Sequence, residues 1–385
     1  MKKLFRHLRD SRFKYNPLVS VNIHKDHLLH NFKYYTTHFP DLMFAPVLKS
    51  NAYGHGYIEV GSILDAKRAP FFVVDSYHEA LILRNEGIKS PLLIIGYTPV
   101  ETVVNNRLSG LMFTIMNDEV DDYVKFVNKP TRFHIKFDTG MHRQGLSLDS
   151  NGSIVPRGTI DNLLSNKNIK IVGICSHLAD ADNTGSLLNN EQIQKWNQLV
   201  DEMSKIIPDI EFYHLSATGG VNNVPRGTIH EKTNTIRLGI GLYGHGERYK
   251  HLKPVMSVNT VITSIRDIKK GDKVGYEGSF VADKNMRIAT IPMGYNEGVD
   301  RRLSNKGVVK IVPRGTMCRV IGKVSMNITS IDVSDLIDIS VGDKVEVIGI
   351  EQSNGNSVMN IAKLCGTISY EILIHINQTL RRNCV

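Results

Sequence analysis

Short apolar runs recur along the first two thirds of the chain, with polar, amphipathic stretches between them. Each run has the length and the β-branched or aromatic character of a strand, whereas the stretches between them have helical spacing. In residues 191–207, for example, apolar side chains from Ile193 to Ile207 recur on one helical face. Strands that alternate with helices over roughly 200–250 residues predict a (β/α)8 barrel of the TIM type. The eight runs are residues 43–48, 71–76, 91–97, 111–115, 132–138, 169–177, 210–217 and 235–244.

The pattern changes after about residue 250. Segments such as SVNTVITSIRDIKKGDKVGYEG and VGDKVEVIGI are β-branched runs interrupted by glycine-containing turns, and a helical pattern returns only at residues 358–373. We therefore predict an α/β protein with two domains. The barrel is expected over residues 18–248, and a mainly-β domain over residues 249–385, with residues 1–17 packed on the latter.

Composition excludes several classes of protein. The chain has 385 residues, 41% of them hydrophobic, which is typical of a soluble globular protein. Its net charge of +9 is scattered without a basic block, which argues against a nucleic-acid partner. We see no signal peptide and no stretch long enough to span a membrane, and so expect a cytoplasmic protein. Four widely spaced cysteines without a CxxC pair predict free thiols and no metal site: Cys175, Cys318, Cys365 and Cys384.

Candidate chemistry gathers where the predicted barrel strands end. The stretch APVLKSNAYGHGY, residues 45–57, places Lys49 after the first strand, followed closely by Gly54 and Gly56. Most lysines are solvated surface groups, but glycines allow the backbone to approach a ligand. Barrel enzymes bind ligands at this end of the strands, often through phosphate. Each further polar group there also has an ordinary structural explanation, so only their agreement on one face carries weight. These groups are Lys136 and Arg143 in KFDTGMHRQG, His177 in SHLADAD, Thr218 in HLSATGG, and Arg237, Gly239 and Ile240 in RLGIGLYGHG.

A lysine beside a phosphate-binding region suggests a Schiff base to pyridoxal 5'-phosphate. The stretch APVLKSNAYGHGY resembles the attachment signature for this cofactor in the alanine racemase family. The likeness extends over nearly the whole chain after the first fifteen or so residues, through KFDTGMHRQG, SHLADAD, IRLGIGLYG, VGYEGSF, IPMGYNEG, GKVSMN and ISYEIL. It implies a homodimeric isomerase that interconverts L-alanine and D-alanine, supplying D-alanine for peptidoglycan.

The resemblance also implies roles for single residues. Lys49 is similar to the lysine that carries the cofactor and acts as one catalytic base, and Tyr276 to the opposite base, contributed by the partner subunit. Arg237 resembles the residue that faces the pyridine nitrogen, His177 its support, and Arg143 the group near the cofactor phenolate and the substrate. The remaining matches are Tyr53, Thr218, Gly239, Ile240 and Tyr370 for phosphate, Tyr295 and Arg301 for the inner gate of the substrate channel, Met326 for the substrate carboxylate, and Lys136 for a carbamylated lysine.

The chemistry of this set is coherent. Racemisation removes a proton from one face of Cα and returns one to the other, so two bases must flank it. An arginine such as Arg237 cannot give up its proton, which would leave the pyridine nitrogen unprotonated and discourage transamination. The chain departs from the usual pattern at Asn327, where aspartate is common, at Ala217 and Thr218, and in the tail NQTLRRNCV.

Other functions remain open from the residues alone. A racemase for serine, for a basic amino acid or for a broader range of substrates would share these motifs, as would a catalytically impaired regulatory homologue. A single-barrel carrier of the cofactor would lack the β domain. The two-domain amino-acid decarboxylases share both domains, but the tyrosine in VGYEGSF favours racemisation.

Overall fold

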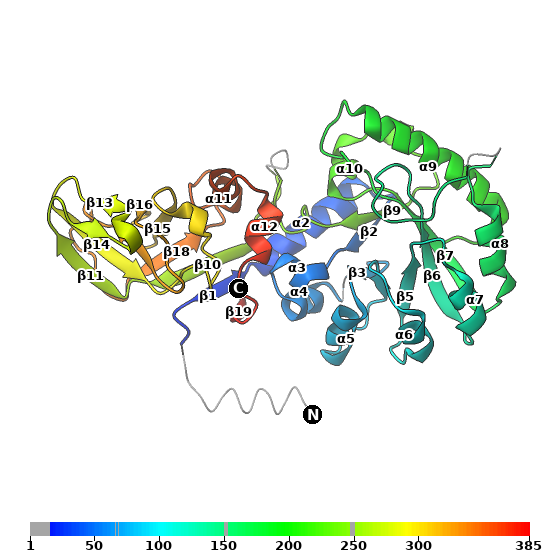
Figure 1. Ribbon diagram of the computed structural model, residues 1–385, viewed down its shortest axis with the longest axis horizontal. Helices are drawn as coiled ribbons and strands as arrows, with labels where there is room; N and C mark the ends of the chain where they lie inside the picture. Colours follow the sequence, from blue (N-terminus) through cyan, green and yellow to red (C-terminus); the bar gives the residue numbers. More distant parts are fainter. Residues whose placement is uncertain (1–15, 66, 68, 150–152, 247–250) are drawn as a thin grey trace. The chain divides into compact units, whose positions relative to one another are not determined.

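The computed structural model describes residues 16–65, 67, 69–149, 153–246 and 251–385 (Figure 1). The chain divides into two compact units. The barrel unit contains residues 32–49 and 64–239, and the β unit contains residues 16–31, 50–63 and 240–385, apart from the gaps just given. Within the described residues, no helix is both long and apolar enough to cross a membrane. The boundary expected between residues 248 and 249 stays a prediction, and residues 1–15 of the segment expected to pack on the β domain lie outside the described residues.

The barrel unit is built on eight parallel strands, which confirms the predicted architecture. Strands β3 to β8 form one sheet in chain order, and β2 pairs with β9. Single bridges from Val47 to Val73 and from Ala217 to Arg237 connect these two sheets at both edges and close the ring. The strands are β2 (Met43–Pro46), β3 (Phe72–Val74), β4 (Leu92–Ile94), β5 (Leu111–Ile115), β6 (Thr131–Lys136), β7 (Ile169–Cys175), β8 (Phe212–His214) and β9 (Thr235–Leu238).

Helices connect the barrel strands, and α5 to α9 lie along the outer side of β3 to β8 (Figure 1). The longest helix is α9, and the apolar residues expected on its inner face are buried there: Ile193, Trp196, Leu199, Val200 and Met203. It begins earlier than expected, at Leu187, because the Ser186 hydroxyl caps it by accepting the Asn189 N–H; Ile207 lies just beyond its end. The helices are α2 (Lys25–His38), α3 (Lys49–Tyr53), α4 (Tyr57–Leu64), α5 (Tyr77–Asn85), α6 (Val100–Asn105), α7 (Asp121–Phe126), α8 (Arg157–Ser165), α9 (Leu187–Ile206), α10 (Thr218–Asn223) and the 3-10 turn η1 (Arg226–Thr228).

The β unit is a nine-stranded, mostly antiparallel sheet in the order β11-β14-β17-β16-β15-β18-β10-β1-β19. Strand β1 was not expected from the sequence; it pairs with β10 and, in parallel, with β19. A separate ribbon of β12 and β13 carries the turn η2 (Tyr276–Gly278). The strands are β1 (Ser20–Ile23), β10 (Met256–Val261), β11 (Ser264–Ile268), β12 (Lys273–Val274), β13 (Phe280–Val281), β14 (Met286–Ile291), β15 (Val308–Ile311), β16 (Thr316–Ile321), β17 (Thr329–Asp332), β18 (Lys344–Ile348) and β19 (Arg382–Cys384).

The helical pattern at residues 358–373 forms two helices rather than one. Helix α11 (Val358–Cys365) ends at Gly366, whose φ of 64° is left-handed, and α12 (Ser369–Ile374) follows. A left-handed glycine is a common helix terminator, so the single helix expected from periodicity is wrong at this residue. A further 3-10 turn, η3 (Arg301–Leu303), precedes β15.

Candidate active site

The backbone after β2 makes a left-handed turn. Residues 50–53 all have φ between 52° and 55°, although none of them is glycine. This conformation costs L-residues roughly 1–2 kcal/mol each and persists only where surrounding contacts fix it. The Gly54 N–H donates to the Ser50 carbonyl at 3.1 Å, and the Tyr57 N–H donates to Asn51 Oδ1 at 3.0 Å. The backbone that follows the candidate lysine is therefore held in a strained conformation.

Lys49 itself begins α3, directly after the strand region of β2. Its Nζ lies 3.9 Å from Asp75 Oδ1, and the two side chains are 37% and 56% exposed. An ion pair with this separation and exposure contributes about 0–1 kcal/mol. Lys49 is therefore not committed to a structural salt bridge and can react with a ligand.

Arg237 on β9 is the most heavily hydrogen-bonded candidate residue. It is 7% exposed. Its Nη1 donates to His214 Nδ1 at 2.5 Å and to the His214 carbonyl at 2.7 Å. Its Nη2 donates to the Ser176 carbonyl at 2.6 Å, to His177 Nδ1 at 2.9 Å and to the Leu215 carbonyl at 3.0 Å. These contacts fix the guanidinium plane. Among the described residues, none accepts a hydrogen bond from Arg237 Nε. This N–H is therefore left for a ligand.

The arginine determines the proton positions on the neighbouring histidines. A guanidinium only donates, so His214 Nδ1 must accept and its proton lies on Nε2. That Nε2–H donates to His134 Nδ1 at 2.7 Å, which places the His134 proton on its own Nε2. Burial lowers the pKa of His134 to about 3, with Arg132 and Arg237 adding to the effect. Burial likewise lowers the pKa of His214 well below its usual value. Both imidazoles are neutral supports of the cation.

The electrostatics of His177 show that five predicted residues lie near one another. Burial lowers the pKa of His177 to about 3, and the positive charges of Arg237, Arg143, Lys136 and Lys49 lower it further, in that order. The four cations thus lie within electrostatic range of His177 in the barrel unit. His177 is a neutral acceptor for Arg237 rather than a second cation.

Lys136 is the last residue of β6. Burial is the main cause that lowers its pKa, and the charges of Arg143 and Arg237 add to it. Its Nζ donates to Gln144 Oε1 at 3.2 Å. A lowered pKa raises the fraction of neutral amine, which is the form that reacts with electrophiles.

Arg143 lies in the loop that follows β6. Asp138 Oδ1 organises this loop by accepting the N–H groups of Gly140, Met141 and His142 at 2.9, 2.9 and 3.0 Å. Arg143 is exposed and lines an open hollow of about 600 Å³ together with Asp138 and His142. The loop therefore presents a cation to a space large enough for a small ligand.

Two further candidates of the barrel unit follow β8 and β9. Thr218 is 2% exposed and begins α10, where Gly219 and Gly220 come next. A Cβ on Gly219 would lie 2.7 Å from Asp182 Oδ1 and 3.1 Å from the Ala181 Cβ, so a larger residue there would displace these side chains. Gly239 directly follows β9 and is buried.

In the β unit, three tyrosines pack together. The Tyr53 ring lies 5.5 Å from that of Tyr370 and 5.1 Å from that of Tyr243. Burial raises the pKa of Tyr53 to about 12, so its phenol stays protonated and can donate. Ile240 is buried, and its carbonyl accepts the Tyr243 N–H at 3.1 Å. Tyr53, Tyr370 and Ile240 were candidates from the sequence, but Tyr243 was not.

The other candidates of the β unit are exposed. Tyr276 is 67% exposed in η2, where Gly275 has a φ of 75° and the neighbouring Glu277 pairs with Lys323 at 2.5 Å. Tyr295 and Arg301 line a hollow of about 300 Å³. The carbonyl of Met326 accepts the Asn296 N–H at 2.9 Å. The structure thus groups Tyr295 with Arg301, and backbone hydrogen bonds join the segment of Tyr295 to that of Met326.

The hydrogen bond that Asn327 makes explains why asparagine suits this position, where the family usually has aspartate. Its amide Nδ2 donates to Glu297 Oε1 at 2.6 Å. An aspartate in this place would bring two carboxylates into contact, and like charges destabilise each other at that distance. The amide is therefore matched to Glu297 in this chain.

Sequence reasoning missed the histidines behind Arg237. His134 and His214 each interrupt an otherwise apolar strand, in RFHIKF and IEFYHL, and a polar residue at an inward strand position is the signal that could have identified them. Gly173 on β7 makes room for one of them, since a Cβ there would lie 2.4 Å from His134 Nδ1.

The chain is similar to known proteins over both units. Residues 23–247 match the model of the alanine racemase N-terminal domain, and residues 255–384 match that of the alanine racemase C-terminal domain. An alanine racemase of Syntrophobacter fumaroxidans is 33% identical over 341 residues, covering 86% of this chain and 88% of that protein. The solved alanine racemase of Clostridium difficile 630 is 27% identical, with a TM-score of 0.85 and 96% of each chain covered. That of Bartonella henselae, described as carrying covalently bound pyridoxal phosphate, is 25% identical, with a TM-score of 0.80, covering 96% of this chain and all of the other.

Proposed function

We propose that this chain, which belongs to the alanine racemase family, interconverts L-alanine and D-alanine by a two-base mechanism that depends on pyridoxal phosphate. Its relatives identify it as an amino-acid racemase, an isomerase. The observation that carries the proposal is the guanidinium of Arg237, fixed by five hydrogen bonds, one of them to His177. The charges of Lys49, Lys136 and Arg143 act on the same histidine.

The donor set of the barrel unit fits this cofactor. Arg237 has its Nε–H left over after its other donors are used, which suits a ring nitrogen that accepts a hydrogen bond. Lys49 would hold the cofactor covalently, and Thr218 with the backbone near Gly239 would bind its phosphate. The family resemblance adds Tyr53, Ile240 and Tyr370 of the β unit as further candidates for phosphate binding. When bound, pyridoxal phosphate supplies an electron sink that stabilises negative charge at the substrate Cα.

The chain's own residues would then move the protons. Lys49 takes the Cα proton on one face of the substrate, and the Tyr276 phenol returns a proton on the other. Because Arg237 cannot release a proton, it would leave the ring nitrogen of a bound cofactor unprotonated and so weaken the electron sink. This would limit side reactions that need a longer-lived charge at the substrate Cα. Tyr276 would come from the partner subunit of a homodimer, so that each site needs two chains.

Further residues would position the substrate. Arg143 and the backbone of Met326 would bind its carboxylate, and Tyr295 and Arg301 would restrict entry to small amino acids. The lowered pKa of Lys136 supports its carbamylation, since the reaction requires a neutral amine. The carbamate would place a negative charge beside Arg143. The product D-alanine would serve peptidoglycan synthesis.

Reductive labelling tests the proposal directly. The protein loaded with pyridoxal phosphate is treated with borohydride and digested, and the peptide that carries the cofactor is identified by mass spectrometry. We expect the label on Lys49 and none in Lys49→Ala. A label on another lysine would show that the cofactor site is misassigned. Incubation with single L-amino acids, followed by chiral separation, should give D-alanine faster than D-serine or a basic D-amino acid.

A further inference from the structure

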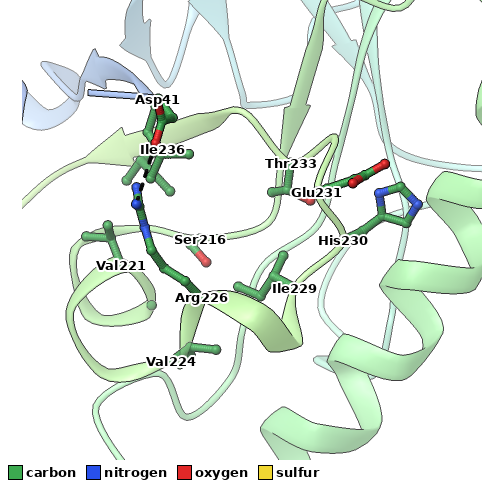
Figure 2. A pocket seen from close by; sticks show the side chains of 12 residues that line it. Asp41, Ser216, Val221, Val224, Arg226, Ile229, His230, Glu231, Thr233 and Ile236 are labelled. Carbon is green, nitrogen blue, oxygen red and sulfur yellow. Dashed lines mark ion pairs between the residues drawn. The ribbon is translucent and has the colours of Figure 1, made fainter. Parts of the chain in front are cut away.

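A second pocket lies entirely within the barrel unit, beside β9, and none of the candidate residues above lines it (Figure 2). It encloses about 200 Å³. The chain between β8 and β9 forms most of its wall, and Leu42, just before β2, completes it. Its body is apolar, lined by Leu42, Val221, Val224, Ile229 and Ile236.

A buried hydroxyl points into this pocket without a partner. Ser216 is 1% exposed, and within the described part of the chain its Oγ has no hydrogen-bond partner. Figure 2 shows the hydroxyl directed toward the middle of the space. Gly220 keeps this space open, because a Cβ there would lie 2.5 Å from the Ser216 oxygen. Buried polar groups are nearly always hydrogen-bonded, so this hydroxyl indicates a ligand atom that can pair with it.

Thr233 is the other hydroxyl-bearing residue in the lining of the pocket. Thr233 Oγ1 accepts the Trp196 Nε1–H at 2.9 Å. This bond uses an acceptor site of the hydroxyl and leaves its own hydrogen free to donate. Thr233 is 8% exposed and lines the pocket. The Thr233 hydroxyl is thus already bonded to Trp196, which leaves Ser216 as the hydroxyl without a partner among the described residues that line the pocket.

The rim carries charges of both signs. Arg226 Nη1 lies 3.8 Å from Asp41 Oδ2, and their side chains are 52% and 83% exposed. Such a pair is weak, so a ligand can compete for either group. Glu231 adds a second exposed carboxylate. Both ring nitrogens of His230 already have partners, because Nδ1 accepts the Lys232 N–H at 3.1 Å and Nε2 lies 3.1 Å from Asp201 Oδ1.

We propose that this pocket is a second binding site for a free α-amino acid with an apolar side chain that ends in a hydroxyl. The ligand carboxylate pairs with Arg226, its ammonium pairs with Asp41 or Glu231, its apolar atoms fill the pocket body, and its terminal hydroxyl pairs with Ser216. Alanine has no side-chain hydroxyl to pair with Ser216. The site is therefore distinct from the one proposed for racemisation, in its ligand as well as in its residues.

Methyl NMR of the full-length holoenzyme tests this site, with L-tyrosine as the probe. The methyl groups of Val221, Val224, Ile229 and Ile236 report on the pocket. L-tyrosine should shift them saturably, and the shifts should persist in excess L-alanine, which would occupy the proposed active site. L-phenylalanine, which lacks the hydroxyl, should bind about tenfold more weakly, the equivalent of one hydrogen bond. Absence of shifts at the solubility limit of L-tyrosine, or their loss in excess L-alanine, would overturn the proposal.

Three variants assign the contacts. Ser216→Ala should abolish the difference between L-tyrosine and L-phenylalanine, and Arg226→Gln should weaken both. Arg157→Gln is the matched control, since Arg157 is an equally exposed arginine paired with Asp161 on α8, and it should leave both affinities unchanged. If p-cresol, which lacks the charged groups, binds as tightly as L-tyrosine, or if Ser216→Ala keeps the difference, the assignment of an amino acid is wrong.

Discussion

The candidate residues of the barrel unit are buried and held by many hydrogen bonds, whereas several of those in the β unit are exposed and hold few. Arg237 is 7% exposed, while Tyr276 is 67% and Met326 56% exposed. A fixed cation can stabilise charge without rearranging. Single exposed apolar groups are common on protein surfaces, so the partner subunit proposed for Tyr276 needs a test of its own. The comparison teaches that the barrel unit holds its candidate residues in a preorganised environment, whereas the exposed candidates of the β unit have no such environment of their own in the described residues.

The largest expected effect is the loss of turnover when one of the two proposed bases, Tyr276, is replaced. Tyr276→Phe removes only the phenol hydroxyl, so turnover should fall about 10²- to 10⁴-fold, the usual contribution of one acid–base group. Exchange of the Cα hydrogen in D₂O should become strongly unequal for L- and D-alanine, because Lys49 still acts on one face. Absorbance of the bound cofactor should not change. Tyr77→Phe, which loses a phenol hydrogen bond to Asn106 outside the candidate site, serves as control. Equal exchange from both enantiomers would rule out the two-base model.

Mixed subunits test whether the exposed tyrosine acts in a partner's site. Lys49→Ala and Tyr276→Phe proteins, each inactive alone, are combined under conditions that exchange subunits. A heterodimer with two-fold symmetry would have one site with both defects and one with neither. Activity should return to about half the wild-type value per heterodimer, since one of two equivalent sites is intact. Exchanged dimers, verified by mass spectrometry, without any recovery would show that both residues serve the same site of one chain.

Alanine substitutions at two glycines compare how much stability is lost next to the left-handed turn and in an ordinary loop. Gly54 has a φ of 81°, and a Cβ there would lie 2.2 Å from the Leu373 carbonyl oxygen. Gly87 has a φ of 86°, but nothing lies within 4 Å of its Cβ position. Gly87→Ala should therefore cost only the dihedral penalty, roughly 1 kcal/mol. Gly54→Ala adds a backbone clash and should cost more than about 3 kcal/mol. Urea unfolding measures both, and equal losses would mean that the packing around Gly54 yields easily.

The same turn shows where sequence reasoning stops. The eight apolar runs predicted the barrel strands because each run is local and dense. Nothing local predicts left-handed dihedrals at residues 50–53, since the sequence there contains no glycine. The turn is held by the hydrogen bonds that Gly54 and Tyr57 donate back to it, and Leu373, distant in sequence, packs against Gly54. The position of the lysine was thus readable from the sequence, and the backbone that presents it was not.

The candidate site was likewise predictable from the sequence only in part. Motifs identified Lys49, Arg143, His177 and Arg237, which lie close together in the structure. The chain from Arg237 through His214 to His134 was missed because it depends on the register of β6, β7 and β8. That register shifts between Phe133 and His134, and so is not fixed by periodicity. Strand β1 was missed for a related reason. It has only four residues, and it is stabilised by pairing with β10 and β19, which are distant in sequence.

The smallest expected effect concerns this buried chain of histidines. His134→Phe preserves an aromatic ring between Phe71 and Phe212, whose centroids each lie 5.5 Å from that of His134. It leaves the His214 Nε2–H without an acceptor, which should cost about 1–3 kcal/mol at neutral pH. The unfolded state gains a proton on His134 near pH 6.5, whereas the folded state does so only near its pKa of about 3. The wild-type protein therefore loses stability from this residue as the pH falls from about 6.5 toward 3, and the variant does not. The difference in unfolding free energy, measured with urea at pH 7 and pH 5, should shrink at the lower pH. A difference that stays constant or grows would show that His134 is not a buried neutral acceptor for His214.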